Sequence, residues 1–196
     1  MLGRASARTP RLLPGLDDAT PRVRAATATA LRGRDDARDA LVAARCGSMA
    51  ERSRRGGRGP RALASASSAL VDALDDPSVP VVEAALAALG ESPADVTARL
   101  ASFAEDARRA STLRRAALDA VAARCDASAA PTLERIAEGS FDASLPPYEQ
   151  EVGHAALAAL ARVAPDRARA WIARMQANAA ALAAVERSAR GGCRRR

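Results

Sequence analysis

Few residues in this chain of 196 amino acids could act directly in a reaction. His154 is the only histidine, and a histidine acting as a general base needs an orienting carboxylate and a nucleophile within reach. The three cysteines, Cys46, Cys125 and Cys193, lie far apart and form no CxxC pair. We therefore expect neither a zinc site nor a disulfide framework, but reduced, structural cysteines and a cytoplasmic location.

The sequence also lacks the glycine-rich and nucleophile motifs of common enzymes. GxGxxG, GxxxxGK[ST] and GxSxG are all missing, and the glycine-rich run from Arg55 to Gly59 follows no expected strand. A single histidine is too few for a multi-histidine metal centre. We predict that the protein is not an enzyme and holds no cofactor or metal.

The net charge of +7 comes entirely from arginine, because the 30 positive residues include no lysine. Residues 45–61 contain six arginines and one acid, and residues 187–196 contain five arginines and no acid. These clusters are candidates for phosphate contact through bidentate guanidinium groups: Arg52, Arg54, Arg55, Arg58, Arg194, Arg195 and Arg196. No aromatic residue interleaves with them, which argues against stacking on exposed bases.

The composition predicts an all-α protein. Alanine, the strongest helix former, accounts for 53 residues, whereas phenylalanine, tryptophan and tyrosine together account for four. No apolar run approaches the ~18 residues that a membrane span needs, and the first residues lack the apolar core of a secretory signal. We expect helices near 8–17, 21–32, 35–46, 61–75, 78–90, 93–106, 110–124, 127–138, 147–163 and 165–188.

A sequence repeat organises these helices. Leu16–Leu31 aligns without gaps on Leu74–Leu89, with seven of sixteen positions identical at an offset of 58, about two periods of 29. Its second half recurs at Leu113–Val121 and Val152–Leu160. Such helices bury one stripe of apolar and small residues, which a single pair cannot cover, so the copies should stack. The offset also implies an intermediate, degenerate unit that ends in the basic loop 48–60.

The run Leu16-Asp17-Asp18 followed by Val23-Arg24 resembles the HEAT repeat, in the short bacterial form shared with phycobilisome-lyase-type proteins. The resemblance covers roughly residues 8–165 and is interrupted where Val82 and Gly153 replace the motif arginine. It implies a right-handed α-solenoid, or α-α superhelix, of about four to five HEAT-like helix pairs. The expected segments are N-terminal repeats over 1–47, the basic loop, further repeats with a capping helix over 61–188, and a basic tail over 189–196.

The resemblance also implies roles for individual residues. In HEAT arrays the motif aspartate and arginine commonly bridge adjacent units, which would make a structural ladder of Asp18, Arg24, Asp76 and Arg114.

The family usually binds partners through a concave face lined by the second helices, and the register assigns a solvent-facing strip of that face to Glu83, Arg115, Asp119 and His154. An ordinary solvated face is the competing interpretation. The expected function is a non-catalytic scaffold or adaptor that binds another protein, with no membrane. The alternatives are an arginine-mediated nucleic-acid or polyanion binder and a lyase-like or other enzyme subunit.

Overall fold

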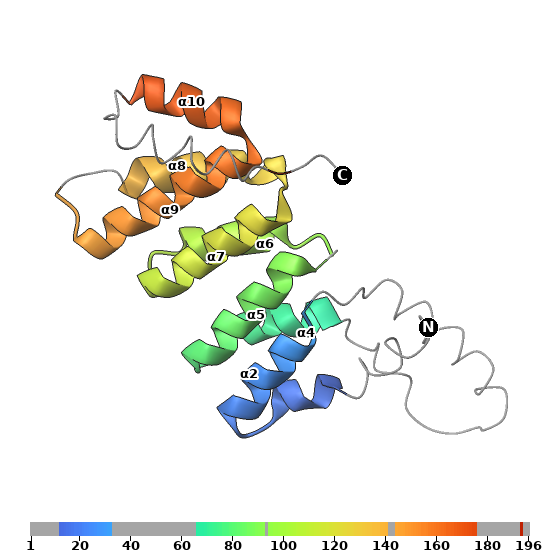
Figure 1. The fold of residues 1–196 in the computed structure, drawn as a ribbon. Coiled ribbons are helices and arrows are strands. Elements are labelled where there is room, and N and C mark those ends of the chain that lie inside the picture. The colour runs from blue at the N-terminus through green and yellow to red at the C-terminus, as the bar shows by residue number, and fades with distance from the viewer. Residues whose placement is uncertain (1–11, 33–65, 93, 141–143, 176–192, 194–196) are drawn as a thin grey trace, which may run out of the picture. The chain divides into compact units, whose positions relative to one another are not determined.

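A computed structural model describes residues 12–32, 66–92, 94–140, 144–175 and 193. Within these ranges all regular structure is helical, which confirms the all-α prediction (Figure 1). The chain divides into two compact units, Met1–Ala94 and Asp95–Arg196, and each is considered by itself below. This boundary lies inside the stretch 61–188 that the sequence grouped together.

Prolines and loop residues set most helix bounds close to the expected ones. The helix predicted over 147–163 is α9, Pro147–Val163, since Pro147 and Pro165 each begin a helix. The helix predicted over 8–17 is described only from residue 12, as the 3₁₀ helix η2, Leu13–Asp17, where Pro14 and Gly15 disfavour a longer helix. The predicted helix 35–46, the loop 48–60 and most of the tail 189–196 lie outside the described residues.

The first unit contains two copies of the repeat in direct contact. After η2 come α2, Pro21–Ala30; α4, Ala66–Asp72; the 3₁₀ helix η3, Ala73–Asp75; and α5, Val79–Glu91. α2 packs against α5, and α4 packs against α5 and η2. The degenerate intermediate unit expected between the copies falls on residues 33–65, which lie outside the described residues, so it stays a prediction.

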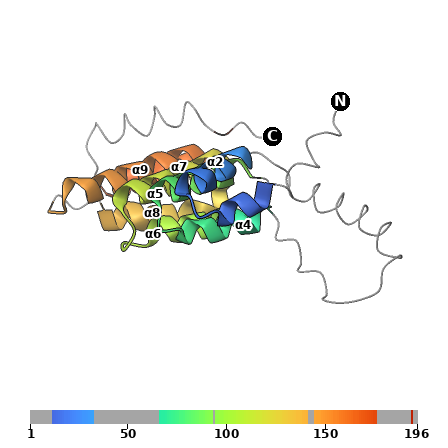
Figure 2. The same ribbon diagram turned by 90° about the horizontal axis from the view of Figure 1, so that it is seen from below.

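The described residues of the second unit form two helix pairs and one further helix. Its elements are α6, Thr97–Glu105; α7, Ser111–Arg124; the 3₁₀ helix η4, Ala127–Ala129; α8, Ala130–Ser140; α9; and α10, Pro165–Arg174. α6 packs against α7 and α8, and α9 packs against α7 and α8. The unit thus has two layers, α6 with α8 and α7 with α9 (Figure 2).

Large and small apolar side chains share the core of this unit. Leu118, Leu133 and Leu160 are fully buried, and so are the small Ala117 and Ala156, which let the helix backbones approach closely. α10 packs on α9 and contributes Trp171, which has no exposed surface. Trp171 therefore packs α10 against the core of the unit.

A disulfide joins Cys125 to Cys193, 68 residues later in the chain. The expectation of reduced, unpaired cysteines was therefore wrong for these two residues, whereas Cys46 lies outside the described residues. The sequence did not indicate this pairing, because α8, α9 and α10 all lie between the two cysteines along the chain. In the described part of the chain, no helix combines the length and apolar character needed to cross a bilayer.

Gly153 allows α9 to lie close to the end of α8, and this predicts a specific loss of stability. A Cβ atom at Gly153 would lie 2.8 Å from the Cβ atom of Ser140 and 2.9 Å from its backbone oxygen. We expect Gly153→Ala to lower the free energy of unfolding by about 1–3 kcal/mol. Urea unfolding followed by the fluorescence of Trp171 in the same unit measures the change.

Gly139 provides a matched control, because a Cβ atom there meets nothing within 4 Å. Gly139→Ala should leave stability unchanged or raise it by about 0.5 kcal/mol, as alanine is the better helix former. Equal effects of the two substitutions would contradict the close approach of α9 to Ser140.

Candidate functional site

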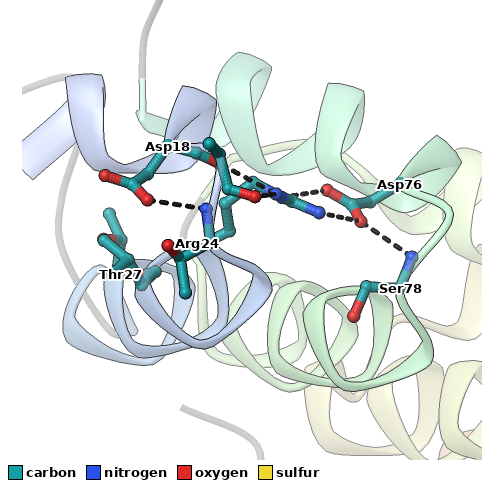
Figure 3. Close-up of polar contacts among 8 residues, drawn as sticks. Asp18, Arg24, Thr27, Asp76 and Ser78 are labelled. Atoms are coloured by element: carbon teal, nitrogen blue, oxygen red, sulfur yellow. Dashed lines mark hydrogen bonds and ion pairs between the residues drawn. The ribbon is translucent and has the colours of Figure 1, made fainter.

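Arg24 forms the polar centre of the first unit (Figure 3). Its Nε and Nη2 atoms donate to the two carboxylate oxygens of Asp76, at 2.6 and 3.0 Å. Its Nη1 atom donates to the backbone oxygens of Asp18 and Ala19, at 2.8 and 3.1 Å. The Arg24 and Asp76 side chains are only 13% and 11% exposed, so this charge-assisted pair is largely screened from water. One guanidinium thus links the loop before α2 to the loop before α5.

Both of these loops contain the same local turn. The Oδ1 atom of Asp76 accepts a hydrogen bond from the backbone N–H of Ser78, and that of Asp18 accepts one from Thr20, at 2.8 and 2.7 Å. Asp126 repeats the arrangement with Ser128 in the second unit, at 2.9 Å. The hydrogen bond from Arg24, followed by that from Ser78, lowers the pKa of Asp76 below its usual value.

Arg114 occupies the same repeat position in the second unit and makes an equivalent bridge. Its side chain is 5% exposed; Nε donates to the backbone oxygen of Ala104 at 2.9 Å, and Nη1 donates to Glu149 at 2.6 Å. Arg114 therefore ties the end of α6 to the first turn of α9. The expected ladder thus contains two bridges, Arg24 to Asp76 and Arg114 to Glu149, whereas Asp18 contributes its backbone oxygen and a local turn.

Sequence reasoning missed Glu149, because the expected acid was a loop aspartate. The available signal was an acidic residue in the first turn of a helix that begins at Pro147, where the helix dipole favours negative charge. At the two interrupted positions, Val82 is buried in α5 and Gly153 is buried in α9. The same repeat position therefore faces the interior in all four copies, whichever residue occupies it.

The predicted strip falls into two parts. Arg115, Asp119 and His154 are exposed on α7 and α9, which lie side by side in the second unit, whereas Glu83 is exposed on α5 in the first unit. Arg115 donates to Glu151 of α9 at 2.6 Å, in a pair whose side chains are 49% and 58% exposed. Glu151, which sequence reasoning also missed, lies three residues before His154 and shares its helix face.

The pKa of Asp119 lies above its usual value. Partial burial raises its pKa, and the positive charge of Arg115, four residues earlier on α7, opposes the rise. The α7–α9 strip, defined as Arg115, Asp119, Glu151 and His154, thus combines both signs of charge on two neighbouring helices. This arrangement can position complementary charges of a partner.

The opposite layer carries a second set of ion pairs that the sequence did not indicate. Arg135 of α8 pairs with Glu105 of α6 at 2.9 Å, and Arg167 of α10 pairs with Glu134 of α8 at 2.8 Å. Arg174 of α10 pairs with Glu138 of α8. Exposed pairs of this kind contribute about 0–1 kcal/mol each, but together they link successive helices of the layer.

The arginines proposed for phosphate contact all lie outside the described residues: Arg52, Arg54, Arg55, Arg58, Arg194, Arg195 and Arg196. Among the residues that are described, no group of three histidine, cysteine, aspartate or glutamate side chains could hold a metal ion. Comparisons of the chain with protein-family models, curated proteins and solved structures find no match.

The adjacent residues Arg114 and Arg115 predict opposite responses to the same substitution. Arg114→Met leaves Glu149 and a buried backbone oxygen without their donor, so we expect a loss of about 2–4 kcal/mol in the free energy of unfolding. Arg115→Met breaks an exposed ion pair and should change the free energy of unfolding by less than about 0.5 kcal/mol. Urea unfolding followed by Trp171 fluorescence distinguishes them, and equal losses would show that Arg114 is not a buried bridge.

The low pKa of Asp76 predicts a pH-dependent contribution to stability. A carboxyl whose pKa is lower in the folded state stabilises the protein above its unfolded-state value of about 3.9, and the contribution is lost as the pH falls through the folded-state pKa. Asp76→Asn should therefore lower the thermal midpoint strongly at pH 7 and much less near pH 2.5, measured by circular dichroism. Asp17→Asn removes an exposed carboxylate near Asp18 and controls for loss of charge. A pH-independent effect of Asp76→Asn would refute the ion pair with Arg24.

Proposed function

We propose that this protein is a short right-handed α-solenoid of HEAT-like helix pairs that binds another protein and catalyses no reaction. The repeated sequence of Leu16–Leu31 and Leu74–Leu89 supports the repeat architecture. The recurrence of an arginine bridge that is largely screened from water in each unit supports it further, because Arg24 and Arg114 occupy the same repeat position and connect successive helix pairs. Stacked pairs of this kind expose one continuous layer of second helices to partners.

The proposed contact surface is the α7–α9 strip, taken as part of a concave face. The observation that carries this assignment is the exposed Arg115–Glu151 pair, which places both signs of charge on adjacent, well-packed helices beside Asp119 and His154. A surface of mixed sign favours a protein partner with complementary charges over a uniformly anionic polymer. Glu83 occupies the equivalent repeat position of α5 in the first unit and is exposed there.

The proposal includes a bacterial setting, on the basis of composition. The excess of alanine, arginine, glycine and proline is typical of GC-rich coding sequences. The cytoplasmic location was expected from reduced cysteines. The disulfide between Cys125 and Cys193 removes that support for these two residues, because cytosolic thiol pools keep most cysteines reduced.

The test is quantitative affinity capture from a bacterial lysate with the full chain as bait, followed by mass spectrometry. The strip variant combines Arg115→Ala, Asp119→Ala and His154→Ala. We expect it to capture each specifically bound protein in an amount at least tenfold lower than the parent chain does. The matched control combines Arg135→Ala, Glu105→Ala and Thr132→Ala, which remove the same charges from the opposite layer. We expect this control to capture the same proteins as the parent chain. Both triple variants must first show the helical content and thermal midpoint of the parent chain.

Three results would overturn the proposal. Loss of partners in the control variant alone would place the contact on the α6–α8 layer. Retention in both variants would exclude the α7–α9 strip. Capture of nucleic acid, with affinity falling steeply between 50 and 200 mM salt, would favour the arginine-mediated polyanion binder.

A further inference from the structure

We propose that Cys125 and Cys193 form a reversible thiol–disulfide modification site, which exchanges with low-molecular-weight thiols and disulfides of the glutathione type. In the oxidised state this site links Cys193 to Cys125 at the end of α7. The inference goes beyond partner binding, because it concerns a covalent change that the chain itself undergoes. It rests on the disulfide and on the surroundings of Cys125 in the structure.

Cys125 lies where an external thiol can reach it. It follows the last residue of α7 in the left-handed conformation, with φ of 58°, and among the described residues no other non-glycine residue has a positive φ. This conformation turns the chain out of the helix; Cys125 is exposed to solvent, and Cys193 is partly exposed. Exposed disulfides are open to attack by thiolates, whereas buried structural ones are protected.

The structure places a hydrogen-bond acceptor beside Cys125 that a reduced thiol could use. Its Sγ atom lies 3.7 Å from the backbone oxygen of Ala122, within reach for a hydrogen bond from a free thiol. In the oxidised form the same sulfur is bonded to Cys193. The turn that ends α7 can therefore persist in both states, since its backbone N–H also bonds to Ala122.

The two sulfurs are chemically unequal, which suggests the order of the steps. In the sequence Cys193 is followed directly by three arginines, and neighbouring guanidinium groups favour a thiolate. Cys125 lies at the C-terminal end of α7, where the helix dipole disfavours negative charge. Cys193 is therefore the attacking thiol, and Cys125 is the resolving thiol.

Oxidation then proceeds by two exchanges. The Cys193 thiolate attacks one sulfur of a small-molecule disulfide RSSR; the S–S bond of RSSR breaks, RS⁻ leaves, and Cys193 carries a mixed disulfide. Cys125 gives its proton to solvent and attacks the Cys193 sulfur, and the second RS⁻ leaves. The protein loses two electrons and two protons, and RSSR becomes two RSH. Reduction by excess RSH reverses both steps.

The bond changes the stability of the second unit. It links positions 68 residues apart, and α8, α9 and α10 all lie within the closed loop. Closing a loop of this length restricts the unfolded chain much more than the folded one. Oxidation should therefore raise the thermal midpoint by about 5–15 °C.

The experiment equilibrates the full chain with reduced and oxidised glutathione over a range of ratios. Free thiols are trapped by alkylation, the remaining disulfides are reduced and alkylated with a second reagent, and mass spectrometry assigns each cysteine. We expect a peptide linked through Cys125 and Cys193, with half-reduction by millimolar reduced glutathione. Cys125→Ser and Cys193→Ser should each abolish the difference in thermal midpoint between oxidised and reduced protein, whereas the control Cys46→Ser should retain it.

Two results for the parent chain would overturn the proposal without any variant. Free Cys125 and Cys193 in excess oxidised glutathione, or pairing of either with Cys46, would show that the site does not form. A Cys125–Cys193 bond that resists ten millimolar reduced glutathione would show a permanent cross-link instead of a reversible site. Neither result depends on partner binding, so failure here is distinct from failure of the proposed function.

Discussion

A buried guanidinium between successive helix pairs is the interaction on which the packing of each unit depends. Alanine-rich helices offer little apolar surface for each residue, so apolar burial alone specifies their register weakly. Arg24 and Arg114 remove that ambiguity, because each donates both to backbone oxygens of its own pair and to a carboxylate of the next. The same register positions the residues next to these arginines, and Arg115 accordingly faces Glu151.

The four copies of the repeat fill the position of this arginine in different ways. Where Val82 replaces it, an apolar side chain is buried; where Gly153 replaces it, a whole side chain is omitted and α9 closes on Ser140. A charged bridge sets the relative orientation of two helices through several hydrogen bonds, whereas valine and glycine set only the distance between the helices. The repeat pattern therefore preserves the burial of the position and not its chemistry.

Much of the site could be predicted in outline but not in its pairings. The repeat register identified Arg24, Asp76 and Arg114 as bridging residues, and two of them do pair with each other. The roles of Glu149 and Glu151 were not predicted. The sequence shows that both residues lie near the start of one helix, but it does not show which helix packs beside that one. The ion pairs of Arg135, Arg167 and Arg174 were missed for the same reason.

The sequence by itself determined the helical class, most helix bounds and the inward-facing positions, because alanine content, prolines and the spacing of apolar residues act locally along the chain. Only the tertiary structure decided that α2 packs directly against α5 and that Cys125 meets Cys193. Both features join positions separated by dozens of residues. Local preferences do not fix the path of the chain over such distances, whereas the packing of complete helices does.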